Sequence, residues 1–192
     1  MKSKKSSPKD SKSWAIFRDP AFSRRQLWQL FTVCAFPVQI WAVLVMLQEL
    51  PVFLLRLSLW DIINVIAYIE ASTLLESGLI WLVLVLVAAI LPGWLFRSRL
   101  IPQATVILLL SSLWAVAFHF RLNAFWELSR PLQMAWIVTY FVSLALAVYY
   151  LHQSKKVEGW LVAFVDRLEP LATLYLVLGV LGAVIVVVRN LF

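Results

Sequence analysis

The chain has 192 residues, of which 62% are hydrophobic, and its formal net charge is +7. Soluble domains are about 45–50% apolar, and a single core in a chain of this length cannot bury the excess. The composition therefore excludes an ordinary soluble domain and predicts that much of the surface faces lipid. We expect an all-α, multi-pass integral protein of the cell membrane.

Eight of the 17 basic residues fall within residues 1–25, ahead of the first apolar run. A basic segment of this kind is retained on the cytoplasmic side and attracted to anionic lipid headgroups, at about 1 kcal/mol per side chain near the surface. We expect a disordered cytoplasmic tail that contacts anionic lipids and not nucleic acid. The expected lipid contacts are Lys2, Lys4, Lys5, Lys9, Lys12, Arg18, Arg24 and Arg25.

Five long apolar runs follow the tail. Each has close to the length, about 20 residues, that a helix needs to cross the hydrocarbon core of a bilayer. The last run has the strongest signal, because it contains 12 Leu, Ile and Val residues and no charged residue. Pro37 in the first run is expected to kink its helix and not to end it. The expected spans are residues 27–47, 78–96, 103–120, 131–151 and 171–188.

Residues 52–69, between the first two runs, are apolar enough to suggest a sixth span. Arg56 and Asp61 oppose insertion, because each costs about 2.5–3.5 kcal/mol near the centre of a membrane helix. The basic residues favour five spans, since five spans place thirteen of the 17 on the cytoplasmic side. We therefore expect residues 52–77 to form an outer interfacial or re-entrant helix.

The same reasoning predicts the organisation of the whole chain. Residues 26–192 should form a single transmembrane domain, with the N-terminus in the cytoplasm and the C-terminus outside. Residues 157–168 carry apolar side chains at helical spacing beside basic residues, which predicts a short inner interfacial helix. The expected fold is a bundle of five transmembrane helices plus one outer and one inner interfacial helix.

No sequence motif for a cofactor, a metal or a catalytic reaction is found. The chain has no Gly-rich phosphate loop and no H-E-x-x-H or G-x-S-x-G pattern. His119 and His152 are too few and too far apart to indicate a metal site, and the single cysteine, Cys34, cannot form an internal disulfide. We expect no cofactor, no metal site and no catalytic residue.

The best candidate site lies on the expected outer face, where charged residues and a histidine follow the third span. Opposite charges at a membrane surface can bind a lipid headgroup or a sugar-phosphate, with arginine as the anion ligand. The simpler interpretation is that short loops need polar residues and that arginine side chains extend to the interface. The candidate residues are His119, Arg121, Glu127 and Arg130, together with Asp61 and Glu76 from a polar stripe in 52–77.

Small residues recur at helix-packing spacing in several spans, as with Gly179 and Ala183 in the last one. Such faces let helix backbones approach closely in lipid. None of the expected spans contains Asp, Glu, Lys or Arg in its middle. Proton- and ion-coupled transporters usually carry such a residue, so its absence counts against that class.

These features favour a non-enzymatic subunit, scaffold or accessory factor that binds membrane lipids and another membrane protein. A lipid- or glycan-handling protein of the cell envelope is the first alternative, and a small transporter or pore is the second. In layout, five spans with an outer C-terminus resemble the membrane part of lipoteichoic-acid-synthase-type enzymes, whose large catalytic domain follows the last span. Because this chain ends at Phe192, the resemblance implies catalysis by another polypeptide.

Overall fold

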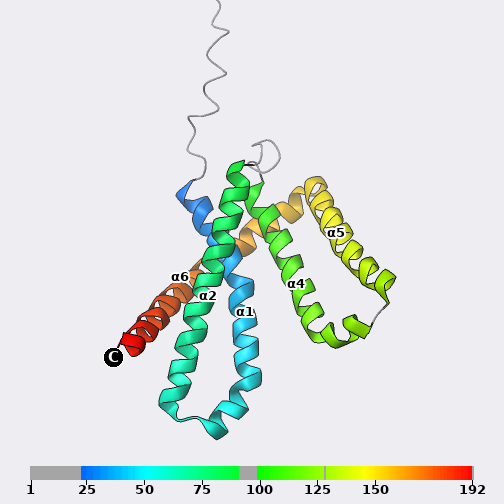
Figure 1. The fold of residues 1–192 in the computed structure, drawn as a ribbon. Coiled ribbons are helices and arrows are strands. Elements are labelled where there is room, and N and C mark those ends of the chain that lie inside the picture. The colour runs from blue at the N-terminus through cyan, green and yellow to red at the C-terminus, as the bar shows by residue number, and fades with distance from the viewer. Residues whose placement is uncertain (1–22, 91–98, 128, 192) are drawn as a thin grey trace, which may run out of the picture.

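The computed structural model describes residues 23–90, 99–127 and 129–191. Within these ranges the chain is entirely helical, with five helices and no strand (Figure 1). Each helix contains a segment long and apolar enough to cross a membrane, and a helix satisfies its own backbone hydrogen bonds, which lipid cannot do. The helices are α1 (Arg24–Arg56), α2 (Leu59–Ile90), α4 (Leu100–Glu127), α5 (Arg130–Gln153) and α6 (Lys155–Leu191).

The helices form two antiparallel hairpins and one long crossing helix. Figure 1 shows α1 and α2 as the longer hairpin, α4 and α5 as the shorter one, and α6 passing from the second hairpin to the first. The most extensive helix contacts are those that α2 makes with α6 and with α1. The all-helical, five-helix prediction is therefore confirmed for the described residues.

The two separate interfacial helices that the sequence predicts are not supported. Residues 52–56 complete α1, residues 59–77 form the first half of α2, and residues 157–168 lie within α6. A change from polar to apolar sequence does not end a helix, because ending one requires a cap or a residue that breaks the backbone hydrogen bonding. Residues 91–96 of the second expected span lie outside the described residues.

Local sequence explains where the helices begin and turn. Ser23 caps α1, and its hydroxyl and backbone exchange hydrogen bonds with Gln26 in a capping box. Extended backbone at Leu57 ends α1, and the Ser58 hydroxyl donates to the Asp61 carboxylate at 2.7 Å as α2 begins. A turn this short forces α1 and α2 to run antiparallel as neighbours.

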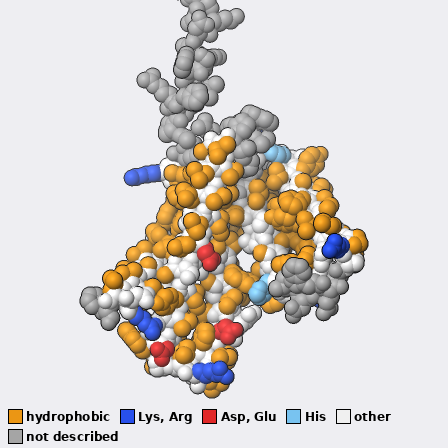
Figure 2. Space-filling view, in the orientation of Figure 1, with side chains coloured by type: hydrophobic (Ala, Val, Ile, Leu, Met, Phe, Trp, Pro, Cys, Tyr) orange, Lys and Arg blue, Asp and Glu red, His pale blue; other side chains and the backbone are white. Residues whose placement is uncertain are grey.

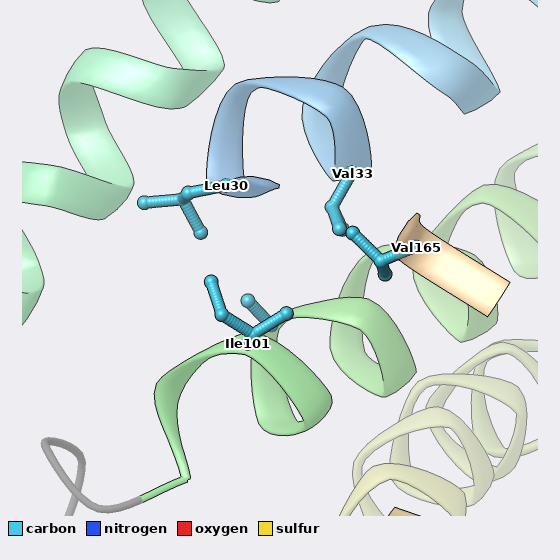
Figure 3. Packing of buried hydrophobic residues seen from close by; sticks show 5 residues of the cluster. Leu30, Val33, Ile101 and Val165 are labelled. Atoms are coloured by element: carbon cyan, nitrogen blue, oxygen red, sulfur yellow. The ribbon is translucent and has the colours of Figure 1, made fainter. Parts of the chain in front are cut away.

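A small apolar core joins three helices at the end of the bundle where α1 and α4 begin. Leu30 and Val33 of α1, Ile101 and Ala104 of α4, and Val165 of α6 are all buried. Their side chains point toward one another in Figure 3, which labels four of the five. This cluster connects the two hairpins, because it contains residues from both and from the crossing helix.

Most other large apolar side chains are exposed, and Figure 2 shows them covering most of the visible face. In α5, Leu151 is the one fully buried residue among those described. Contiguous apolar surface on this scale is typical of proteins that contact lipid or a membrane partner. The exposed surface therefore agrees with a multi-pass membrane protein.

Two glycines allow α6 to approach α2 closely. A Cβ atom at Gly182 would lie 2.6 Å from the Ala67 carbonyl oxygen, and one at Gly179 would lie 2.7 Å from the Cβ of Leu74. Without a side chain at these positions, the two backbones can pack at a distance that any larger residue would prevent. The predicted role of Gly179 in helix packing is thus confirmed, and Gly182, which the sequence did not single out, packs against the backbone of α2.

We expect the Gly182→Val substitution to destabilise the protein by about 1–3 kcal/mol, because the added side chain meets backbone that cannot move aside. Gly159→Val is the matched control, since a Cβ at Gly159 has nothing within 4 Å. Thermal unfolding of the purified protein in detergent measures both variants. Equal melting temperatures for the two would contradict the close approach of α6 to α2.

Candidate functional site

Two hydrogen bonds define the register between α1 and α2. The Trp81 indole N–H donates to the Leu27 carbonyl oxygen at 3.0 Å, and Gln39 Nε2 donates to Glu70 Oε2 at 2.6 Å. Leu27 begins the first apolar run and Gln39 lies near its middle. Glu70 is therefore level with the middle of the run 27–47.

This register corrects the prediction that no span has an ionisable residue in its middle. Glu76 lies between Glu70 and Trp81 on α2, so both acidic residues fall beside the run 27–47. Hydropathy scores each helix separately and cannot detect that polar residues of α2 have partners on α1. The sequence argument against ion-coupled transport consequently no longer holds.

Polar side chains surround the Gln39–Glu70 pair at the junction of α1, α2 and α6. Gln39 is 4% exposed, and Thr73 and Ser77 are also buried. The Thr73 hydroxyl donates to the Glu70 carbonyl oxygen at 3.0 Å, while Gln39 Oε1 has no hydrogen-bond partner among the described residues. A cavity of about 10 Å³ lies beside the pair, at the lower limit of the volume that holds one water molecule. Its lining residues are Phe31, Ala35, Gln39, Thr73, Leu74, Ser77 and Tyr175.

A larger hollow lies between the first hairpin and α4. It has a volume of about 410 Å³, and Figure 2 shows the surface hollowed between the two hairpins. An adjoining hollow of about 330 Å³ shares Val38, Trp41 and Glu76 with it. We call the two together the central groove. The lining residues of the larger hollow are Pro37, Val38, Trp41, Glu76, Ser112, Ala115, Val116, Phe118 and His119.

Two residues that the sequence singled out, Glu76 and His119, therefore face the same groove. The His119 ring packs edge-on against Trp41, with ring centroids 4.9 Å apart and planes at 77°. Within the part of the chain that the structure describes, neither Glu76 nor His119 has a hydrogen bond or an ion pair. The sequence could not predict that Glu76 and His119 lie on one groove, because they belong to different helices. Their placement follows from the packing of these helices around Trp41.

The other predicted outer residues are distributed over separate helix ends. Asp61 lies at the tip of the first hairpin, where two bonds from Ser58 and the nearby Arg189 stabilise its carboxylate. Arg121 and Arg130 are exposed on α4 and α5. The side chain of Glu127 lies outside the described residues. The headgroup-binding role of this cluster stays a prediction.

At the opposite end, an ionic network attaches the start of α6 to the other helices. Asp166 accepts from Arg25 at 3.3 Å and from Gln29 Nε2 at 2.6 Å, and Arg99 pairs with Glu158 at 3.5 Å. Arg25, which the sequence assigned to lipid contact, thus has a partner within the protein. Lys2, Lys4, Lys5, Lys9, Lys12 and Arg18 lie outside the described residues.

No protein family, no curated protein and no solved structure matches this chain. Among the described residues, no group of three or more His, Cys, Asp and Glu side chains is placed to hold a metal ion. The function is therefore argued from the two polar features of the fold, the Gln39–Glu70 pair and the central groove.

The Gln39–Glu70 bond should contribute measurably to stability, because Gln39 is buried and a half-buried carboxyl group that loses its donor is also unfavourable. We expect Gln39→Leu and Glu70→Leu each to destabilise the protein, and the double variant to cost less than their sum by about 0.6–2 kcal/mol. Unfolding in detergent, followed by tryptophan fluorescence, measures the three values.

Gln48→Leu is the control, because Gln48 is exposed on the same helix and has no hydrogen bond among the described residues. It should leave stability nearly unchanged. Strict additivity of Gln39→Leu and Glu70→Leu would show that the two side chains do not interact in the folded protein.

Proposed function

We propose that the protein is a multi-pass membrane subunit whose partner places a helix with a basic side chain in the central groove. The observation that carries this proposal is Glu76, an acidic residue that faces the groove without a partner among the described residues. The sequence favours a non-enzymatic subunit, and Glu76 adds that the partner helix carries a positive charge.

The proposed placement in the membrane follows from the helix register. If the run 27–47 crosses the hydrocarbon core, Glu76 lies within the bilayer, because its neighbours Glu70 and Trp81 are paired with that run. Basic residues concentrate at the end where α1 begins, which favours an N-terminus in the cytoplasm and a C-terminus outside. The membrane is proposed to be the cell membrane.

An unpaired carboxylate at this depth is unfavourable by about 2.5–3.5 kcal/mol on insertion scales, and ionisable residues inside membranes are normally paired. The residues that line the groove include no lysine or arginine. A Lys or Arg side chain from another chain would neutralise Glu76 and remove this cost. Charge complementarity therefore indicates a cationic partner helix.

The shape of the groove also suits a helix. Ser112 and Ala115 on α4 are small, and such residues let a neighbouring helix approach closely in lipid. Trp41 and Phe118 supply large apolar surfaces on either side. Much of α5 is also open, since Leu151 is its one buried residue among those described. A partner in the groove would cover surface that the chain itself leaves open.

Topology is tested with single cysteines in a Cys34→Ala background, since Cys34 is fully buried and removing it leaves no other thiol. We expect a membrane-impermeant maleimide to label Ser58→Cys and Ser129→Cys on intact cells. Ser154→Cys should react only after permeabilisation, because it lies at the opposite helix ends. Equal labelling of all three on intact cells would contradict five spans in the proposed orientation.

The partner proposal predicts that binding depends on Glu76. We expect Glu76→Gln to reduce co-purification of the partner from native membranes by about 10-fold or more, because a desolvated charge pair is lost. Glu49→Gln, an exposed position outside the groove, should have no effect. Quantitative mass spectrometry of the detergent-purified complex provides the ratio.

Site-specific crosslinking locates the partner. A photoreactive residue at Ala115, inside the groove, should crosslink to a helix that carries Lys or Arg. The same residue at Val142, exposed on α5 and outside the groove, should not. A stable protein that purifies without a partner, or co-purification unaffected by Glu76→Gln, would overturn the proposal.

A further inference from the structure

A second groove lies between α1, α2 and α6, at the end of the bundle where α1 begins. It has a volume of about 380 Å³, and it does not share a lining residue with the central groove. Apart from Arg24 and one glycine, every residue along it is apolar or aromatic. The lining residues are Arg24, Leu27, Trp28, Phe31, Gly78, Trp81 and Leu176.

The walls of this groove are held in place by contacts within the protein. The Trp81 indole is fixed by its 3.0 Å hydrogen bond to Leu27, and Trp28 stacks on Phe31 with ring centroids 5.5 Å apart and planes at 25°. At Gly78 a Cβ atom would have nothing within 4 Å. The floor at Gly78 is therefore open, and a flexible apolar chain can lie directly against the backbone there.

The charge at the mouth of the groove is positive, and the described residues that line it supply no counterion. Arg24 is exposed and has no hydrogen bond or ion pair among the described residues, whereas its neighbour Arg25 is paired with Asp166 at 3.3 Å. No acidic residue lines the groove. An arginine with free donors next to tryptophan rings suits a phosphate group, since guanidinium binds phosphate oxygens in pairs and indoles favour the headgroup level of a bilayer.

We propose that this groove binds one anionic phospholipid, with the phosphate at Arg24 and an acyl chain along Trp28, Trp81 and Gly78. This groove carries a positive charge at Arg24, whereas the central groove carries a negative charge at Glu76. Net negative lipids are favoured over zwitterionic ones because Arg24 is not offset by an acidic residue among the described residues that line the groove. This inference does not depend on the partner helix.

Native mass spectrometry of the full chain in mixed phosphatidylglycerol and phosphatidylcholine micelles tests the proposal. We expect the wild-type protein to retain one phosphatidylglycerol in preference to phosphatidylcholine. Arg24→Gln should reduce that preference by about 5-fold, the effect of one basic side chain near the surface. Gly78→Leu, which fills the groove, should reduce retention of both lipids.

Two matched variants separate specific binding from general effects. Lys156→Gln removes an exposed positive charge away from the groove, and Gly159→Leu adds the same side chain at another open glycine. Neither should change lipid retention. Equal retention of the two lipids by the wild-type protein, or an effect of Lys156→Gln as large as that of Arg24→Gln, would overturn the proposal. If Gly78→Leu lowers the melting temperature, the Arg24→Gln comparison still decides, because Arg24 is exposed and has no hydrogen bond or ion pair among the described residues.

Discussion

The hydrogen bond between Gln39 and Glu70, together with that from Trp81 to Leu27, sets the register of α1 against α2 on which both grooves depend. In a low-dielectric surrounding a carboxyl group needs a donor, and Gln39 is the donor that α1 supplies at 2.6 Å. This pairing brings the first half of α2 beside the first apolar run and not outside it. The glycines of α6 then pack on that same half of α2, which leaves Glu76 directed toward α4. Both grooves therefore follow from one register.

Hydropathy was sufficient to locate four of the five helices, because long apolar runs have few other stable arrangements. The runs 27–47, 103–120, 131–151 and 171–188 all lie within single helices. The errors lay in 157–168, which is part of α6, and in 52–77, where Arg56 and Asp61 suggested a segment outside the bilayer. Those two residues do lie at a hairpin tip, but residues 62–77 belong to a continuous helix that packs on α1 and α6.

The candidate site could be predicted only in part. Glu76 and His119 were predicted to belong to an outer charged cluster. The structure places both on the central groove, where Trp41 of α1 packs against His119 of α4. Glu70, which was not among the candidate residues, is the acidic residue of α2 that meets Gln39. A single helix gives no indication of which of its faces has a polar partner, so this contact required the tertiary structure.

Pro170 divides α6 into two parts with different contacts. Pro170 lies inside this helix and removes a backbone hydrogen bond there. Before it, Val165 packs with α4 and Asp166 bonds to α1; after it, Gly182 and Asn190 contact α2. The part of α6 before Pro170 thus contacts both hairpins, whereas the part after it packs on α2 of the first hairpin. The backbone hydrogen bond that Pro170 cannot make is therefore missing between the part of α6 that joins the two hairpins and the part that packs on α2.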